Sequence, residues 1–114
     1  MTTEEVNFQD WSKLDLRVGK ILKIEDIENA DKLYKLEVDL GKEKRTLVAG
    51  IKQHYEKKEL KGKKCVILSN LEPKKLKGIE SNGMILAAVS EDENGEKVVL
   101  IAPDDEIELG SRIR

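Results

Sequence analysis

One polar stretch of the chain, residues 69–84, combines residue types that suit ligand binding. Lysines offer charge to phosphate groups, amides and hydroxyls offer hydrogen bonds to sugars, and glycines let a backbone approach a ligand closely. Such contacts fix the position of a nucleic acid without reading its sequence. An ordinary solvent loop with a turn at each glycine explains the same residues equally well. The residues concerned are Asn70, Lys74, Lys75, Lys77, Gly78, Ser81, Asn82 and Gly83.

Residues that could carry catalysis or bind a metal are scarce. His54 is the only histidine and Cys65 the only cysteine, whereas a metal site needs a cluster of such ligands. Cys65 stands in an apolar run, which predicts an inert core thiol, and His54 stands in a charged segment, which predicts an exposed side chain. Residues 92–96 are faintly similar to a calcium loop, but the spacing fails and a hairpin turn explains them better. We therefore expect no catalytic residues, no metal, no cofactor and no enzymatic activity.

Charge is unevenly distributed along the 114 residues, although the formal net charge is only −2. Residues 57–77 contain eight lysines and two glutamates, whereas residues 91–108 contain eight acidic residues and one lysine. Steering of a charged partner depends on the local field and not on the sum of charges. The pattern indicates a polarised domain whose basic region could attract a polyanion, although lysine runs are also common on ordinary solvated surfaces.

Short alternating apolar runs predict mostly strands around this basic region. One helix is predicted at residues 53–61, because this segment is rich in Glu and Lys and Gly62, just past its end, can cap it. Asn94-Gly95 and Gly41-Lys42 are typical of hairpin turns. We expect strands at 14–27, 34–40, 46–51, 65–68, 84–89 and 98–102, a turn at 29–31, a helix at 53–61 and a polar loop at 73–83.

Three strands, a helix and two more strands is the order of an OB-fold, although a five-strand count also fits other small barrels. The prediction is one all-β domain over residues 1–114: an N-terminal extension at 1–14, a five-stranded OB-fold barrel with one short helix at 15–89, and C-terminal strands at 90–114. No signal peptide or membrane span is apparent, so a soluble cytoplasmic protein is expected. The chain has only four aromatic residues, which favours recognition of folded RNA by shape over stacking of single strands.

Eight short motifs resemble the stand-alone tRNA-binding domain family. That family includes the C-terminal domain of methionyl-tRNA synthetases, the OB domain of the endothelial monocyte-activating polypeptide II group, and secretion-chaperone-like proteins. Each motif is weak alone, but all run in family order from Asp15 to Gly110. They are Asp15-Leu16-Arg17-Val18-Gly19-Lys20-Ile21, Ala30-Asp31-Lys32-Leu33-Tyr34, Val38-Asp39-Leu40-Gly41, Val48-Ala49-Gly50-Ile51, Leu60-Lys61-Gly62-Lys63, Asn70-Leu71, Lys74-Lys75-Leu76-Lys77-Gly78 and Ser81-Asn82-Gly83-Met84.

The resemblance implies an OB-fold homodimer that presents one combined surface to the outside corner of tRNA and discriminates little among tRNA species. It also implies where RNA binds. Family members usually carry His-Pro before the Ala-Asp-Lys-Leu motif, where this chain has Glu28-Asn29. The implied RNA-binding residues are Lys32, Asn70, Lys74, Lys75, Lys77, Ser81, Asn82 and Met84, followed by Arg17 and Lys20.

Three roles are consistent with the resemblance: a tRNA-binding protein that works in trans with methionyl-tRNA synthetase, a peptide-binding chaperone-like homodimer, and a structural dimerisation subunit. The lysine loop favours the first. An exposed apolar groove lined by Ile79, Met84 or Ile85 would favour the second. For the homodimer, Phe8, Trp11 and residues 98–101 are the expected interface, with capping of their own barrel as the alternative.

Overall fold

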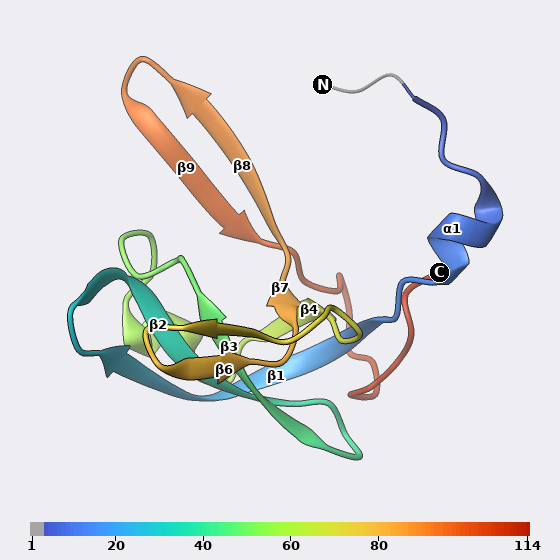
Figure 1. Cartoon of the computed structure of the whole chain (residues 1–114), viewed down its shortest axis with the longest axis horizontal. Helices are drawn as coiled ribbons and strands as arrows, with labels where there is room; N and C mark the ends of the chain where they lie inside the picture. Colours follow the sequence, from blue (N-terminus) through green and yellow to red (C-terminus); the bar gives the residue numbers. More distant parts are fainter. Residues whose placement is uncertain (1–3) are drawn as a thin grey trace.

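The chain is organised around one antiparallel five-stranded sheet in the order β3-β2-β1-β4-β7, with two separate hairpins, β5–β6 and β8–β9 (Figure 1). The structure is a computed structural model that describes residues 4–114, so the first three residues of the predicted extension lie outside the described part. The elements are α1 (Phe8–Ser12), β1 (Leu16–Ile27), β2 (Ala30–Asp39), β3 (Lys44–Ala49), α2 (Lys57–Leu60), β4 (Lys64–Leu68), β5 (Lys74–Leu76), β6 (Ile79–Ser81), β7 (Met84–Ile85), β8 (Ala87–Asp92) and β9 (Gly95–Leu100).

The long hairpin of β1 and β2 forms the middle of the sheet. Its alternating apolar residues point into the core, which confirms the predicted strands, although β2 begins at Ala30 and the turn is correspondingly tighter than expected. Asn29 takes a φ of 62° in this turn, a left-handed conformation that asparagine tolerates well. The register of β1 shifts between Ile21 and Lys23, and this bulge bends the strand.

The core lies on one side of the sheet and consists of aliphatic side chains from β1 to β4, such as the fully buried Ile21, Leu36 and Ile67. Cys65 is fully buried among them, and this burial raises the pKa of its thiol to about 12. The interpretation of Cys65 as a core thiol is thereby confirmed. The expectation of an exposed His54 is wrong: its side chain is only 20% exposed and lies 3.4 Å from Glu96.

The helix predicted at 53–61 is limited to the four residues of α2. Tyr55 donates its backbone N–H to Ile51, and its side-chain oxygen accepts the N–H of Leu100, so this segment turns to keep its apolar side chains against the core. Glu56 then starts the helix by exchanging capping hydrogen bonds with Glu59. Tertiary contacts here override the helix propensity of the Glu- and Lys-rich sequence.

Two predictions between residues 73 and 102 are wrong. The loop expected at 73–83 is the hairpin β5–β6, and the strand expected at 84–89 is divided into β7 and β8. The backbone N–H of Leu86 bonds to Val66 at the point of division, after which β8 leaves the sheet and pairs with β9. The β8–β9 hairpin projects away from the sheet (Figure 1). It turns at Gly95, as the Asn94-Gly95 pair predicted. Its second strand, β9, begins at Gly95, three residues before the strand expected at 98–102.

The all-β class is confirmed, but the strands do not pair into a continuously closed barrel. β3 and β7 are the two edges of the five-stranded sheet. The chain just before β7 lies along β3, where Asn82 donates its backbone N–H to the carbonyl of Thr46 at 2.9 Å. The two edges are therefore joined by individual hydrogen bonds.

The C-terminal tail completes the other end of the molecule. It runs beside the start of β1, with the N–H of Val18 bonded to Ser111 and the N–H of Gly110 bonded to Val18. Gly110 has a φ of 88° and its Cα packs on the backbone of Leu40, where a side chain would collide. Among the described residues, no helix is long and apolar enough to cross a membrane.

Candidate nucleic-acid interface

The three clustered lysines are carried by the hairpin β5–β6, residues 74–81, which we call the lysine hairpin. Its turn is formed by Lys77 and Gly78, with φ values of 51° and 81°, as in a type I′ turn. Leu76 and Ile79 are half-buried beneath the hairpin, whereas Lys74, Lys75 and Lys77 are exposed. None of these three lysines forms an ion pair with another described residue.

Ser81 holds the lysine hairpin against β3. Its hydroxyl accepts the backbone N–H of Val48 at 2.9 Å and donates to the carbonyl of Gly83 at 3.2 Å, and the residue is only 6% exposed. Gly83 has a φ of 134°, and a Cβ there would lie 2.9 Å from the carbonyl oxygen of Leu68. Ser81 therefore positions the hairpin, and its hydroxyl is already bonded within the protein.

The two predicted asparagines differ in what their side chains do. Asn70 accepts the backbone N–H of Asp15 at 2.9 Å and donates to the carbonyl of Lys13 at 2.6 Å, so its amide ties the N-terminal segment to the end of β4. The half-buried Asn82 has no described partner for its side-chain amide, which leaves that amide available to a ligand. Met84, in β7 two residues along, is 47% exposed.

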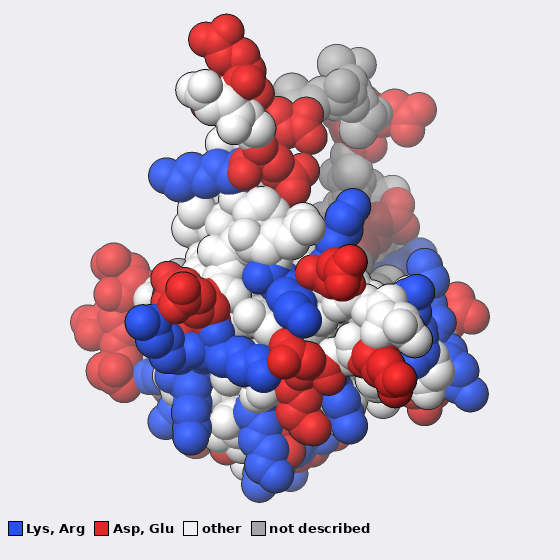
Figure 2. Space-filling model, turned by 90° about the vertical axis from the view of Figure 1, so that its left-hand side faces the viewer, with Lys and Arg blue, Asp and Glu red and all other residues white. Residues whose placement is uncertain are grey.

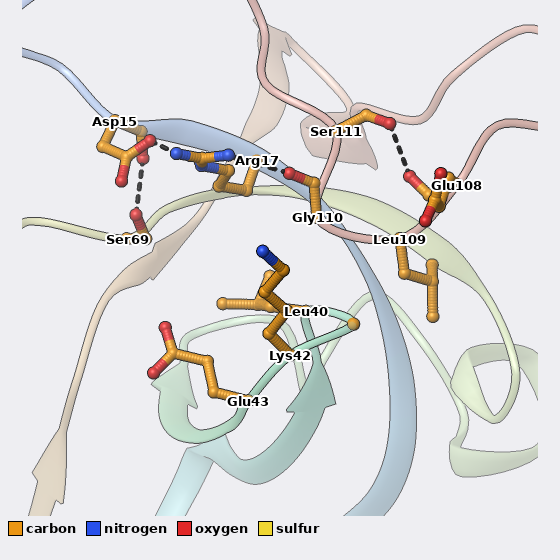
Figure 3. A pocket seen from close by; sticks show the side chains of 11 residues that line it. Asp15, Arg17, Leu40, Lys42, Glu43, Ser69, Glu108, Leu109, Gly110 and Ser111 are labelled. Carbon is orange, nitrogen blue, oxygen red and sulfur yellow. Dashed lines mark hydrogen bonds and ion pairs between the residues drawn. The ribbon is translucent and has the colours of Figure 1, made fainter.

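The remaining predicted residues lie in two places. Lys32 is exposed in β2, beside Lys52, which donates its backbone N–H to the Lys32 carbonyl. Arg17 lies in a cavity of about 910 Å³ between the C-terminal tail and the β2–β3 turn (Figure 3). Its guanidinium is bound to Asp15 at 2.6 Å and to the carbonyl of Gly110 at 3.0 Å. Arg17 therefore has a structural role in joining the tail to β1.

Lys20, the last of the predicted residues, is half-buried in β1. It stands opposite Lys64 of β4, and the Lys64 ammonium lies 2.6 Å from the carboxylate of Glu106 in the acidic tail. The structure thus separates Arg17 and Lys20 from the lysine hairpin. Both lie where the acidic C-terminal segment passes.

One important residue was not anticipated from the sequence. Arg45 in β3 donates from one guanidinium nitrogen to the carbonyl of Ser69 and, at 3.4 Å, to that of Asn82. It is also paired with Glu43 at 3.0 Å. Arg45 thus ties the two ends of the segment that carries the lysine hairpin. Nothing in the local sequence distinguishes it, because its partners are backbone carbonyls brought close only by folding.

Positive charge gathers on the side of the molecule where α2, the β1–β2 turn and the turn of the lysine hairpin lie, at the left of Figure 1. Figure 2 views this side and shows Lys and Arg gathered over its lower part with Asp and Glu between them, while acidic side chains cluster at the tip of the β8–β9 hairpin. Asp26 neutralises part of this positive charge by pairing with Lys52 at 3.0 Å and Lys57 at 2.8 Å. The hydrogen bond from Lys57 lowers the pKa of Asp26, and the same bond raises that of Lys57.

Comparison with known proteins identifies a family. Residues 16–112 match the model of a putative tRNA binding domain. The chain is 57% identical over 111 residues to a methionine–tRNA ligase of Pyrococcus horikoshii and 49% identical over 114 residues to that of Methanosarcina mazei. These alignments cover 97% and 99% of this chain but only 15% and 16% of the ligases.

Solved structures give the same result at full length. A MetRS-related protein from Pyrococcus horikoshii superposes with a TM-score of 0.87 at 40% identity, covering 98% of this chain and all of that one. The chaperone CsaA from Bacillus anthracis superposes with a TM-score of 0.86 at 30% identity, covering 97% of this chain and all of that one. The match over residues 16–112 shows that this chain belongs to the family of putative tRNA-binding domains.

Proposed function

We propose that this chain binds tRNA without catalysing a reaction, by contacting the RNA backbone and recognising its folded shape with little sequence preference. The observation that carries the proposal is the lysine hairpin, in which three exposed lysines without ion pairs stand on a hairpin fixed to β3. Membership of a tRNA-binding family supports the same ligand. Because the hairpin backbone is already fixed, only the lysine side chains must be ordered on binding phosphates, which limits the entropic cost of these contacts.

The positions of the aromatic residues favour recognition of backbone and shape. Tyr34 is buried and donates its hydroxyl to the carbonyl of Tyr55, whose own side chain is packed against the core. Phe8 and Trp11 belong to α1 at the other end of the chain. The lysine hairpin itself carries no aromatic side chain on which a series of bases could stack. An OB-type barrel, formed by the sheet with its two edges bonded together, would support this surface.

Action in trans with methionyl-tRNA synthetase in the cytoplasm is the proposed context. It is supported by the ligases that carry a similar segment, of which this chain spans about 15%. A gel-shift titration with total tRNA, against duplex DNA of equal length as a control, tests the binding. We expect tRNA to be shifted at lower protein concentration than the duplex DNA. Equal shifts by both would show nonspecific attraction to phosphate, and no shift by tRNA would refute the proposal.

A homodimer is proposed through the apolar residues that the fold leaves exposed. Phe8 is 78% exposed and Trp11 36% exposed on α1, while Val99 and Ile101 are 45% and 41% exposed at the end of β9. Leu100 between them is buried in the core, so only the alternate residues of the predicted segment are available. Pairing of two chains through these surfaces would cover them and present two lysine hairpins to one RNA.

A peptide-binding, chaperone-like role is the second candidate. The superposition on the chaperone CsaA over 97% of this chain favours it. Of the residues expected to line an apolar groove, Met84 is exposed, whereas Ile79 and Ile85 are half-buried. Binding of an unfolded, uncharged peptide that tRNA does not displace would support this role over the first.

A further inference from the structure

A second feature of the basic side is a groove of about 350 Å³ between β1 and α2. The bulge between Ile21 and Lys23 lies in the part of β1 that lines the groove, beside a helix of only four residues. Its floor is aliphatic and its rim is charged. The lining residues are Leu22, Lys23, Ile24 and Glu25 from β1, and Lys57, Lys58 and Lys61 from α2 and its C-terminal end.

The floor of the groove is made by two half-buried aliphatic side chains. Ile24 packs against the main core, so it is held in place from below. Leu22 lies at the bulge and is also half-buried. Two fixed aliphatic side chains at the base of an open groove form an apolar surface on which a flat ring can lie.

The rim of the groove offers cations that the protein does not neutralise. Lys57 is committed to Asp26, and Lys58 lies 3.4 Å from Glu56, where both side chains are largely exposed and the pair contributes little. Lys23 and Lys61 have no ion pair with any described residue. The groove therefore combines an aliphatic floor with two unpaired ammonium groups above it.

We propose that this groove holds one unpaired nucleobase of a bound RNA, with the flanking phosphates on Lys23 and Lys61. The proposal rests on the proposed binding of tRNA and adds a contact of a different kind from that of the lysine hairpin. The face of a base is flat and weakly polar and lies between two negatively charged phosphates, and the aliphatic and cationic lining of the groove is complementary to that arrangement. Glu25 at the rim accepts hydrogen bonds, so it favours bases with an amino group over uracil.

The experiment compares oligonucleotides that differ only in their bases. Fluorescence anisotropy measures binding of a six-nucleotide oligocytidylate and of an abasic analogue with the same number of phosphates. We expect the oligocytidylate to bind about fivefold more tightly, equivalent to about 1 kcal/mol, which is the free energy of burying roughly 40 Å² of apolar surface beneath one seated base. The Leu22→Ala variant should lose this difference, because it removes half of the floor. Lys61→Gln should weaken both ligands equally, and Lys97→Gln on β9 serves as the charge-matched control that changes neither.

A second measurement needs no variant. Methyl resonances of Leu22 and Ile24 in the wild-type chain should shift on addition of the oligocytidylate, because a base above them adds a ring current, and should not shift with the abasic analogue. Equal affinity for the two ligands together with unchanged methyl resonances would overturn the proposal. Equal binding of oligouridylate and oligocytidylate would overturn the part assigned to Glu25. Binding of total tRNA in the same preparation tests the proposed function separately, because the lysine hairpin can bind phosphates with the groove empty.

Discussion

Lys77 is the residue at which conformation and proposed function conflict most clearly. A lysine with a φ of 51° costs about 1 kcal/mol relative to its preferred conformations, and asparagine is far better suited to the same place in a type I′ turn. A residue that the local backbone disfavours is expected where its side chain serves a ligand. Substitution of Lys77 should therefore change stability and binding in opposite directions, which distinguishes it from substitution of Lys74 or Lys75.

We predict that Lys77→Asn leaves the free energy of unfolding unchanged or raises it by about 0.5 to 1 kcal/mol. The same variant should weaken tRNA binding and reduce the slope of log affinity against log salt by about 0.9, because one phosphate contact is lost. Urea unfolding and salt titrations measure the two effects. Lys42→Asn, in the β2–β3 turn, is the matched control and should keep wild-type affinity. A more stable Lys77→Asn protein with undiminished binding would contradict this role.

Two glycines of the same segment should respond differently to substitution by alanine. At Gly83 the added Cβ would lie 2.9 Å from a backbone oxygen, whereas at Gly78 it would meet nothing within 4 Å. Both have positive φ, so both carry a conformational cost of about 1 kcal/mol, but only Gly83→Ala adds a collision. We expect thermal melts to show a loss of stability at least twofold larger for Gly83→Ala. Equal losses would show that the close packing at Gly83 is relieved at little cost.

The hairpin β5–β6 carries the proposed RNA-binding site. Ser81 fixes this hairpin to β3, whereas Asn82 has a side-chain amide available to the RNA, so variants of the two residues test different roles. Ser81→Ala leaves the part-buried N–H of Val48 without its acceptor, which should cost about 1 kcal/mol of stability and weaken binding by displacing the hairpin. Asn82→Ala should weaken binding with little effect on stability. Asn82→Ala should leave the salt slope unchanged, because a neutral hydrogen bond releases no counterion, whereas Ser81→Ala should flatten it, because the displaced hairpin carries the lysines. Chemical denaturation and tRNA titrations of both variants test this; a stable Ser81→Ala protein would contradict the supporting role.

The elements that could be predicted from sequence are those whose local pattern and tertiary role agree. β1 and β2 alternate apolar and polar residues and place the former in the core. The lysine hairpin was missed because Lys77-Gly78 is a weak turn signal compared with Asn-Gly, and the short strands of the hairpin are mostly polar. The helix was predicted too long because the packing of Tyr55 was invisible in the sequence.

The residue types of the candidate site could be predicted from the sequence, but the hydrogen-bond partner of each polar side chain could not. The lysines 74, 75 and 77 are exposed as expected, but they stand on a hairpin and not on the predicted loop. Ser81 and Asn70 have side chains bonded to distant backbone groups, at Val48 and Lys13, and sequence cannot show such partners. The importance of Arg45 has the same origin, since its acceptors come from two other segments.

At the scale of the whole molecule, the apolar side chains that remain exposed are the basis for predicting a homodimer. We predict a dimer at tens of micromolar in analytical ultracentrifugation, because Phe8 and Trp11 leave apolar area uncovered on α1. The double variant Phe8→Ser with Trp11→Ser should shift the population toward monomer without unfolding the sheet, since α1 contributes no buried residue. A wild-type monomer throughout the concentration range would contradict the predicted dimer.

The uneven distribution of charge is the other property of the whole molecule, and it leads to the most direct test of tRNA binding. Lysines gather on the side shown in Figure 2, and acidic side chains gather on the β8–β9 hairpin and the tail. A negatively charged RNA should therefore favour the lower, lysine-rich part of this side over the acidic hairpin. The lysine hairpin, if it is the main contact, should account for a fixed part of the salt dependence of binding.

The deciding measurement is a salt titration of tRNA binding by the wild type and by the triple variant Lys74→Ala, Lys75→Ala and Lys77→Ala, with a thermal melt of each. The account predicts that the triple variant melts at nearly the same temperature, because exposed charges contribute little to stability. Its slope of log affinity against log salt should be flatter by roughly 2 to 3 for each subunit's contacts, with every tRNA species weakened alike. Parallel slopes and equal affinities would contradict the account, and would raise the peptide-binding role above it.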